Sequence, residues 1–145
     1  MNALRRALLG IVALGLAKPW AALAAWNKEA FGAKTADAAL KGIGIGAATP
    51  TRDLAMEAPE IAENGAVVPV EITSNLPGTT SIAVLVDKNP FPLVGTFDFT
   101  AGAVPFVKLN LKMGETSEVR VIAQAGGRSY VATKEIKVTI GGCGG

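Results

Sequence analysis

The chain has 145 residues, of which half are apolar and 18% are charged, and it contains no His and a single Cys. This length suits one domain, and the high apolar content argues against disorder. The absence of His and the single Cys exclude a His-based catalytic triad and a Cys/His zinc site within the chain.

Residues 1–24 have the layout of a signal peptide. Arg5 and Arg6 precede an apolar run from Ala7 to Ala17, and Ala22-Leu23-Ala24 supplies small residues at A-x-A spacing. We therefore expect cleavage after residue 24 and a periplasmic mature protein. The paired arginines favour the twin-arginine export route. The apolar run of 11 residues is shorter than the roughly 20 residues that span a bilayer, so no membrane anchor is expected.

Removal of this leader changes the net charge of the chain. Arg5, Arg6 and Lys18 leave with it, so the 14 basic residues fall to 11 against 12 acidic ones, and the net charge falls from +2 to −1. Nucleic-acid binding needs a clustered basic surface, and no run of Lys or Arg remains. Nucleic acid is therefore excluded as a partner.

The domain expected over residues 25–140 begins with a short helical segment. Thr35 is a suitable N-cap for a helix over residues 36–40, and Gly42 is a suitable stop. The glycine-rich segment that follows, residues 42–46, lacks the Lys-Ser/Thr of a phosphate-binding loop. We interpret it as a connector that places Ile43 and Ile45 in the core.

From residue 54 onward, apolar and polar residues alternate with the period of two that is typical of β-strands. The apolar positions of the alternating segments are Leu54, Met56 and Ala58; Val68, Val70 and Ile72; Val107, Leu109, Leu111 and Met113; Val119, Val121 and Ala123; and Ile136, Val138 and Ile140. The run from Ile82 to Val86 is apolar at every position, which is typical of a central strand.

Two positions refine this pattern. Pro69 has no backbone N–H to donate, so its strand is predicted to be an edge strand or to carry a bulge. Gly126-Gly127 is a strong signal for a two-residue hairpin. About seven short strands with turns near every tenth residue predict an all-β fold, specifically an immunoglobulin-like β-sandwich.

The polar loops between these strands give no catalytic or metal-binding constellation. Glu60 and Glu63 flank a turn and have no partner His, so we interpret them as solvated side chains. Residues 87–90, Asp-Lys-Asn-Pro, are interpreted as a plain turn. We therefore predict a protein that is not an enzyme.

The last five residues, Gly141-Gly142-Cys143-Gly144-Gly145, form the candidate functional site. A structural Cys is usually buried among apolar neighbours, whereas this one has only glycines beside it. Glycine has the widest backbone freedom and no side chain, so we expect a flexible arm whose sulfur reaches roughly 10 Å beyond Ile140. A lone thiol on a thin arm is typical of a covalent carrier. Its ordinary pKa of about 8.5 leaves a small thiolate fraction at neutral pH.

The GGCGG tail, the export leader and residues 58–69 together resemble the SoxY family. This resemblance implies an immunoglobulin-like domain that pairs with SoxZ and has no cofactor or catalytic activity of its own. It also implies that the haem protein SoxAX joins Cys143 to thiosulfate as an S-thiosulfonate. The hydrolase SoxB then releases sulfate, and the dehydrogenase SoxCD, where present, oxidises the sulfur that remains.

Two other interpretations stay open. Ubiquitin-like sulfur carriers also end in Gly-Gly, but they hold sulfur on the terminal carboxylate, are cytosolic and contain a long helix. A mass shift on Cys143 rather than on Gly145 would separate the two classes. Alternatively, an exported interaction module would use Cys143 for an intermolecular disulfide, which predicts a covalent dimer and no sulfur adduct.

Overall fold

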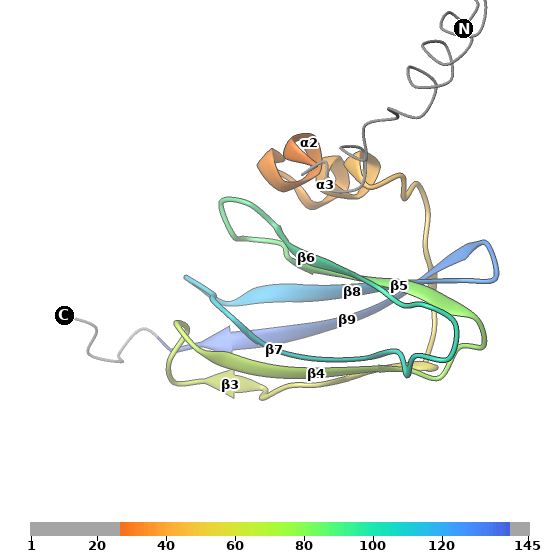
Figure 1. The fold of residues 1–145 in the computed structure, drawn as a ribbon. Coiled ribbons are helices and arrows are strands. Elements are labelled where there is room, and N and C mark those ends of the chain that lie inside the picture. The colour runs from red at the N-terminus through yellow and green to blue at the C-terminus, as the bar shows by residue number, and fades with distance from the viewer. Residues whose placement is uncertain (1–26, 140–145) are drawn as a thin grey trace, which may run out of the picture.

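The computed structural model describes residues 27–139, in which two short helices precede nine strands (Figure 1). The helices are α2 (Lys28–Gly32) and α3 (Ala36–Gly42). The strands are β1 (Thr49–Pro50), β2 (Leu54–Glu57), β3 (Ile61–Ala62), β4 (Val68–Ser74), β5 (Thr79–Val86), β6 (Leu93–Asp98), β7 (Phe106–Leu111), β8 (Ser117–Ala125) and β9 (Arg128–Val138). The predicted all-β class with a short helical N-terminal segment is confirmed.

The strands form two sheets that share one apolar core (Figure 1). The larger sheet has the order β1-β9-β8-β5-β6, with β3 also paired to β9, and the smaller has the order β2-β4-β7. The fully buried side chains between the sheets include Val68, Val70, Ile72, Ile82, Val84, Val86, Val119, Val121 and Ile136. These are positions of the predicted alternation and of the apolar run in β5. Burial of each such side chain stabilises the fold by about 1.5–3 kcal/mol.

The helices cover the outer face of the larger sheet and create a second core (Figure 1). Ala83 and Leu85 of β5 are buried there, which explains why this central strand is apolar on both faces. Ile45 of the predicted connector is also buried in this second core. Gly42 allows the two helices to approach closely, because a Cβ there would lie 2.8 Å from the Ala30 Cα.

The local signals for the helix cap and the hairpin are confirmed. The Thr35 hydroxyl accepts a hydrogen bond from the Ala38 N–H at 3.2 Å, so it caps α3 as predicted. Gly126 and Gly127 connect β8 to β9 with φ values of +56° and +74°. A two-residue turn between antiparallel strands favours such positive φ values, which glycine adopts without strain.

The prediction for Pro69 needs correction, because β4 is the middle strand of the smaller sheet. Its pairing partners differ along its length, however. β7 pairs with residues 68–73, whereas β2 pairs only with residues 71–74. The N-terminal half of β4, where Pro69 lies, therefore has a neighbouring strand on one side only. Proline is tolerated there because no second ladder has to be completed.

Candidate functional site

The predicted site residues, Cys143 and Gly141, Gly142, Gly144 and Gly145, lie outside the described residues. The structure describes the chain as far as Thr139, which is four positions before Cys143 in the sequence. The region where the chain leaves the sheet is therefore the part of the site whose geometry is defined. It consists of the end of β9 and the loops around it.

The end of β9 is held from two sides by hydrogen bonds. On one side β3 runs parallel to it, and the Lys137 and Thr139 N–H groups donate to the carbonyl oxygens of Glu60 and Ala62 at 2.9 and 3.1 Å. On the other side the Val138 N–H donates to the Thr116 hydroxyl at 3.0 Å. These bonds fix the position of the end of β9 and of Thr139, the last described residue.

The loops at this end are also bonded to one another. The Met113 N–H donates to the Gly65 carbonyl at 2.7 Å, which joins the β3–β4 and β7–β8 loops. Gly65 has no room for a side chain, since a Cβ would collide with the Met113 carbonyl oxygen. The Asn89 side-chain amide donates to the Lys112 carbonyl at 2.8 Å and adds the β5–β6 loop. Figure 1 places all three loops at the end of the molecule where β9 ends.

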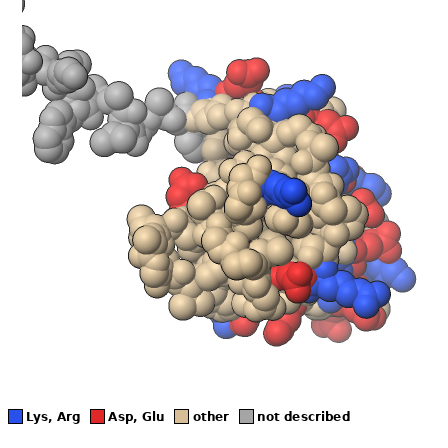
Figure 2. Space-filling view, turned by 90° about the vertical axis from the view of Figure 1, so that its right-hand side faces the viewer, with Lys and Arg blue, Asp and Glu red and all other residues tan. Residues whose placement is uncertain are grey.

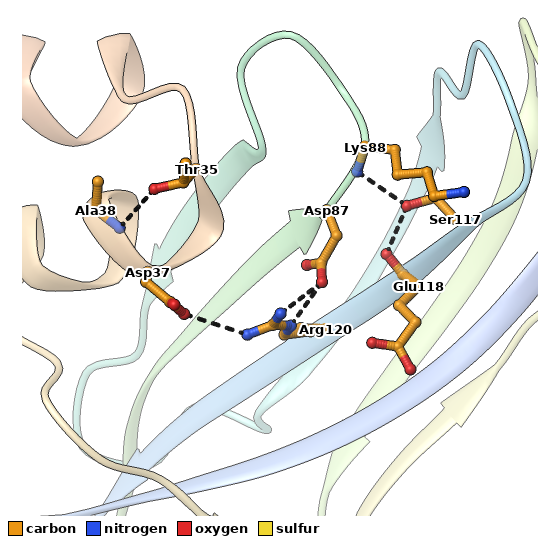
Figure 3. Close-up of polar contacts among 8 residues, drawn as sticks. All are labelled: Thr35, Asp37, Ala38, Asp87, Lys88, Ser117, Glu118 and Arg120. Atoms are coloured by element: carbon orange, nitrogen blue, oxygen red, sulfur yellow. Dashed lines mark hydrogen bonds and ion pairs between the residues drawn. The ribbon is translucent and has the colours of Figure 1, made fainter.

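Figure 3 shows the polar contacts that hold the β5–β6 loop in place. Ser117 is buried at the start of β8, and its hydroxyl accepts from the Lys88 N–H at 3.0 Å and donates to the Glu118 carbonyl at 3.0 Å. Both the donor and the acceptor capacity of this buried hydroxyl are therefore satisfied, which removes the cost of burying it. The interpretation of residues 87–90 as a turn is confirmed.

A charged cluster of Arg120, Asp87 and Asp37 was not predicted from the sequence. Arg120 on β8 donates from Nε and Nη2 to the same Asp87 oxygen, Oδ2, at 2.9 and 2.6 Å (Figure 3). Its Nη1 lies 3.6 Å from Asp37 of α3. Burial alone would lower the pKa of Arg120, but the hydrogen bonds with Asp87 and the nearby acidic charges outweigh burial and raise it. Arg120 thus stays charged and links the β5–β6 loop to β8.

Replacing Arg120 with Met is expected to lower the free energy of unfolding by about 2 kcal/mol, as measured by urea denaturation. The Asp87 side chain is only 19% exposed, so its carboxylate would lose its cation in a partly desolvated place. Asp37→Asn is the control, because Asp37 is 83% exposed and its ion pair with Arg120 is screened by water. Equal losses of stability in Arg120→Met and Asp37→Asn would contradict the larger contribution of the Arg120–Asp87 pair. Adding Asp87→Asn to Arg120→Met should restore much of the stability, because it removes the carboxylate left without its cation.

The acidic residues considered for catalysis do not form a site. Glu60 and Glu63 are both exposed on the segment around β3, as expected of solvated side chains. Within residues 27–139, no group of three or more His, Cys, Asp or Glu side chains could hold a metal ion. The same part of the chain contains no helix with the length and apolar character needed to cross a membrane.

The family model described as sulfur oxidation protein SoxY matches residues 42–143. This range includes most of the described fold and extends through Cys143. The chain belongs to the SoxY family. The resemblance to this family that the sequence indicated is thereby confirmed.

A solved structure supports this membership of the SoxY family. The sulfur carrier protein SoxY from Chlorobium limicola f thiosulfatophilum is 39% identical in sequence and has a TM-score of 0.65. The match covers 72% of this chain and 94% of that one. A superoxide reductase (neelaredoxin) from Ignicoccus hospitalis, at 24% identity and a TM-score of 0.54 over 61% of this chain and 82% of its own, shows a shared fold alone. No curated protein matches the chain.

Proposed function

We propose that this chain carries sulfur covalently on Cys143 during thiosulfate oxidation in the periplasm. The observation that carries the proposal is the SoxY family match through residue 143, because it includes the only thiol in the chain. The Chlorobium relative, described as a sulfur carrier protein, supports the same role. The two sheets around a common core support the finer assignment of the fold as immunoglobulin-like.

The proposed chemistry needs only a thiolate from this chain. Cys143 and thiosulfate form an S–S bond and the thiol proton passes to water, while SoxAX would accept the two electrons one at a time at its haem iron. In the second step, SoxB directs water to the terminal sulfonate sulfur of this S-thiosulfonate. Sulfate and protons are released without a change in electron count, and a persulfide stays on Cys143. Where SoxCD is present, it would oxidise the outer persulfide sulfur, with water supplying the oxygen atoms and the released electrons and protons leaving to the electron acceptor of that enzyme and to water.

The proposal is tested by the intact mass of the protein isolated from cells grown on thiosulfate. We expect increments for an S-thiosulfonate and for one added sulfur atom, both removed by a thiol reductant and both mapped to Cys143 by peptide fragmentation. A covalent dimer without adducts would instead support the interaction module that pairs through an intermolecular disulfide. An increment on Gly145 would support a ubiquitin-like carrier.

The carrier is proposed to act in the periplasm as a heterodimer with SoxZ and to contact SoxAX, SoxB and SoxCD transiently. We expect the mature chain to begin at Ala25 or Trp26, because the leader has a charged start and an A-x-A end. N-terminal sequencing of the protein in the periplasmic fraction tests the location and the cleavage site. Sizing chromatography tests the heterodimer by measuring the stoichiometry of the chain with SoxZ. A cytoplasmic protein that retains Met1 would contradict the proposed location.

A further inference from the structure

We infer that the cavity between the helices and the larger sheet is the docking site for one side chain of this chain, that of Trp26. Trp26 directly precedes the described residues. The cavity has a volume of about 340 Å³ and is lined by residues of α2, α3, β5, β6 and β8. Figure 1 shows the two helices over β6, at the edge of the larger sheet. The inference concerns how the domain is completed at its N-terminal end and does not rest on the carrier function.

The first step of the argument is that Asn27 brings the chain to the wall of the cavity. Asn27 lines the cavity, and its side chain is bonded to both helices. Its Oδ1 accepts a hydrogen bond from the Ala30 N–H at 3.0 Å, and its Nδ2 donates to the Gly42 carbonyl at 2.8 Å. Because consecutive Cα atoms lie about 3.8 Å apart, Trp26 starts beside this wall whichever way the preceding chain runs.

The second step is the spacing of Trp26 and Phe31 around the start of α2. Asn27 is the N-cap of this helix, so Trp26 is the residue before the cap and Phe31 is the fourth residue of the helix. Apolar side chains at these two positions typically pack on each other and fix the angle at which the chain enters the helix. Phe31 is half-buried and lines the cavity. The cap therefore directs the Trp26 side chain toward the cavity.

The third step is the chemical match between the cavity and an indole ring. The helix side of the cavity is apolar, because Ile43 and Ile45 lie there with Phe31. The sheet side carries side-chain oxygen atoms that can accept hydrogen bonds, those of Ser81, Thr96, Asp98 and Gln124. An indole ring combines a large apolar surface with a single N–H donor, so it suits both sides. The volume is at the small end of the roughly 300–1,000 Å³ of ligand pockets, which fits one side chain.

The inference is tested by the fluorescence of Trp26 in the purified SoxZ heterodimer. The chain has two Trp residues, Trp20 and Trp26. Subtracting the spectrum of Trp26→Phe isolates the signal of Trp26, because any signal from Trp20 or SoxZ cancels. We expect an emission maximum that is blue-shifted from that of N-acetyltryptophanamide, and weaker quenching by acrylamide. An emission maximum and a quenching constant equal to those of N-acetyltryptophanamide would overturn the inference.

Thr96→Phe locates the docking site, because Thr96 is exposed on β6 and an aromatic ring there fills the cavity from the sheet side. We expect the Trp26 signal, again isolated by subtraction of Trp26→Phe in the same background, to shift to the red. Thr133→Phe is the matched control, since Thr133 is an exposed residue of β9 outside the cavity lining. Its Trp26 signal should equal that of the unsubstituted protein. An unchanged signal in Thr96→Phe, or equal shifts in both variants, would overturn this cavity as the docking site.

The stability of Trp26→Ala gives a second, independent readout. Loss of a docked apolar side chain is expected to raise the equilibrium constant for unfolding in urea about tenfold to 100-fold. In the Thr96→Phe background the same substitution should have little effect, because the side chain is already displaced. Unchanged stability of Trp26→Ala in the unsubstituted background would overturn the inference. Far-UV circular dichroism checks that every variant is folded before these comparisons.

Discussion

Replacing Cys143 with Ser is expected to reduce thiosulfate-dependent turnover by at least about 1,000-fold, the scale on which enzymes lose activity without their nucleophile. The serine hydroxyl keeps the size of the side chain, but its oxygen cannot form the S–S bond on which the proposed chemistry depends. The chain has no second thiol to substitute for it. Thiosulfate consumption in a system reconstituted with SoxZ and the partner enzymes measures the loss.

The same variant should leave folding unchanged. Both apolar cores consist of residues between 30 and 138, and the last buried side chain among the described residues is that of Ile136. Urea midpoints and SoxZ pairing should therefore match those of the unsubstituted protein. Cys143→Ala is the control for the hydroxyl and should be equally inactive. Turnover retained by either variant would overturn the proposal that Cys143 carries the sulfur.

Those parts of the fold that depend on local chemistry were predictable from the sequence. The alternation in β4 and β8 identifies the buried face because successive side chains of a strand point to opposite faces. The Thr35 cap and the Gly126-Gly127 hairpin depend on a few adjacent residues, so short sequence signals were sufficient.

The features that the sequence analysis missed depend on contacts between distant segments. Arg120 and Asp87 are 33 residues apart, and nothing near either residue indicates that they form a pair. The strand that contains Pro69 was predicted to be an edge strand, but it is the middle strand of the smaller sheet. The prediction failed because β2 pairs only with the half of β4 that lacks Pro69, and the extent of a pairing depends on both strands. The two-residue strand β3 is too short to show any periodicity, and its pairing with β9 was likewise not foreseen.

The candidate site also has a part that depends on adjacent residues and a part that depends on contacts between distant segments. The tail at residues 141–145 is a prediction from sequence alone, made from one thiol among glycines in five consecutive residues, and it lies outside the described structure. The support at the end of β9 could not be predicted, because it depends on backbone groups of Ala62 and Gly65 and on the Thr116 hydroxyl. Any residue type can make a backbone hydrogen bond between loops, so the sequence does not reveal such bonds. The exception is a position such as Gly65, where only glycine fits the space.

Replacing both Gly142 and Gly144 with Val is expected to slow turnover with the partner enzymes about 100-fold, while Cys143 stays present. Valine adds bulk on each side of the thiol and restricts the backbone that glycine leaves free. A misplacement of about 1 Å of a reacting atom lowers an enzymatic rate on this scale. Turnover of the reconstituted system at saturating carrier measures the effect.

The rate of Cys143 alkylation by iodoacetamide distinguishes the shape of the arm from the reactivity of the thiol. This reagent is small and needs no enzyme pocket, so alkylation of the double Val variant should proceed at nearly the normal rate. The variant with Ala at both positions is the matched control. Its turnover should lie between that of the unsubstituted protein and that of the double Val variant, because Ala adds one methyl group without β-branching. Normal turnover in the double Val variant would show that Cys143 works without a thin arm. A parallel fall in alkylation would mean that the glycines control exposure or pKa of the thiol instead.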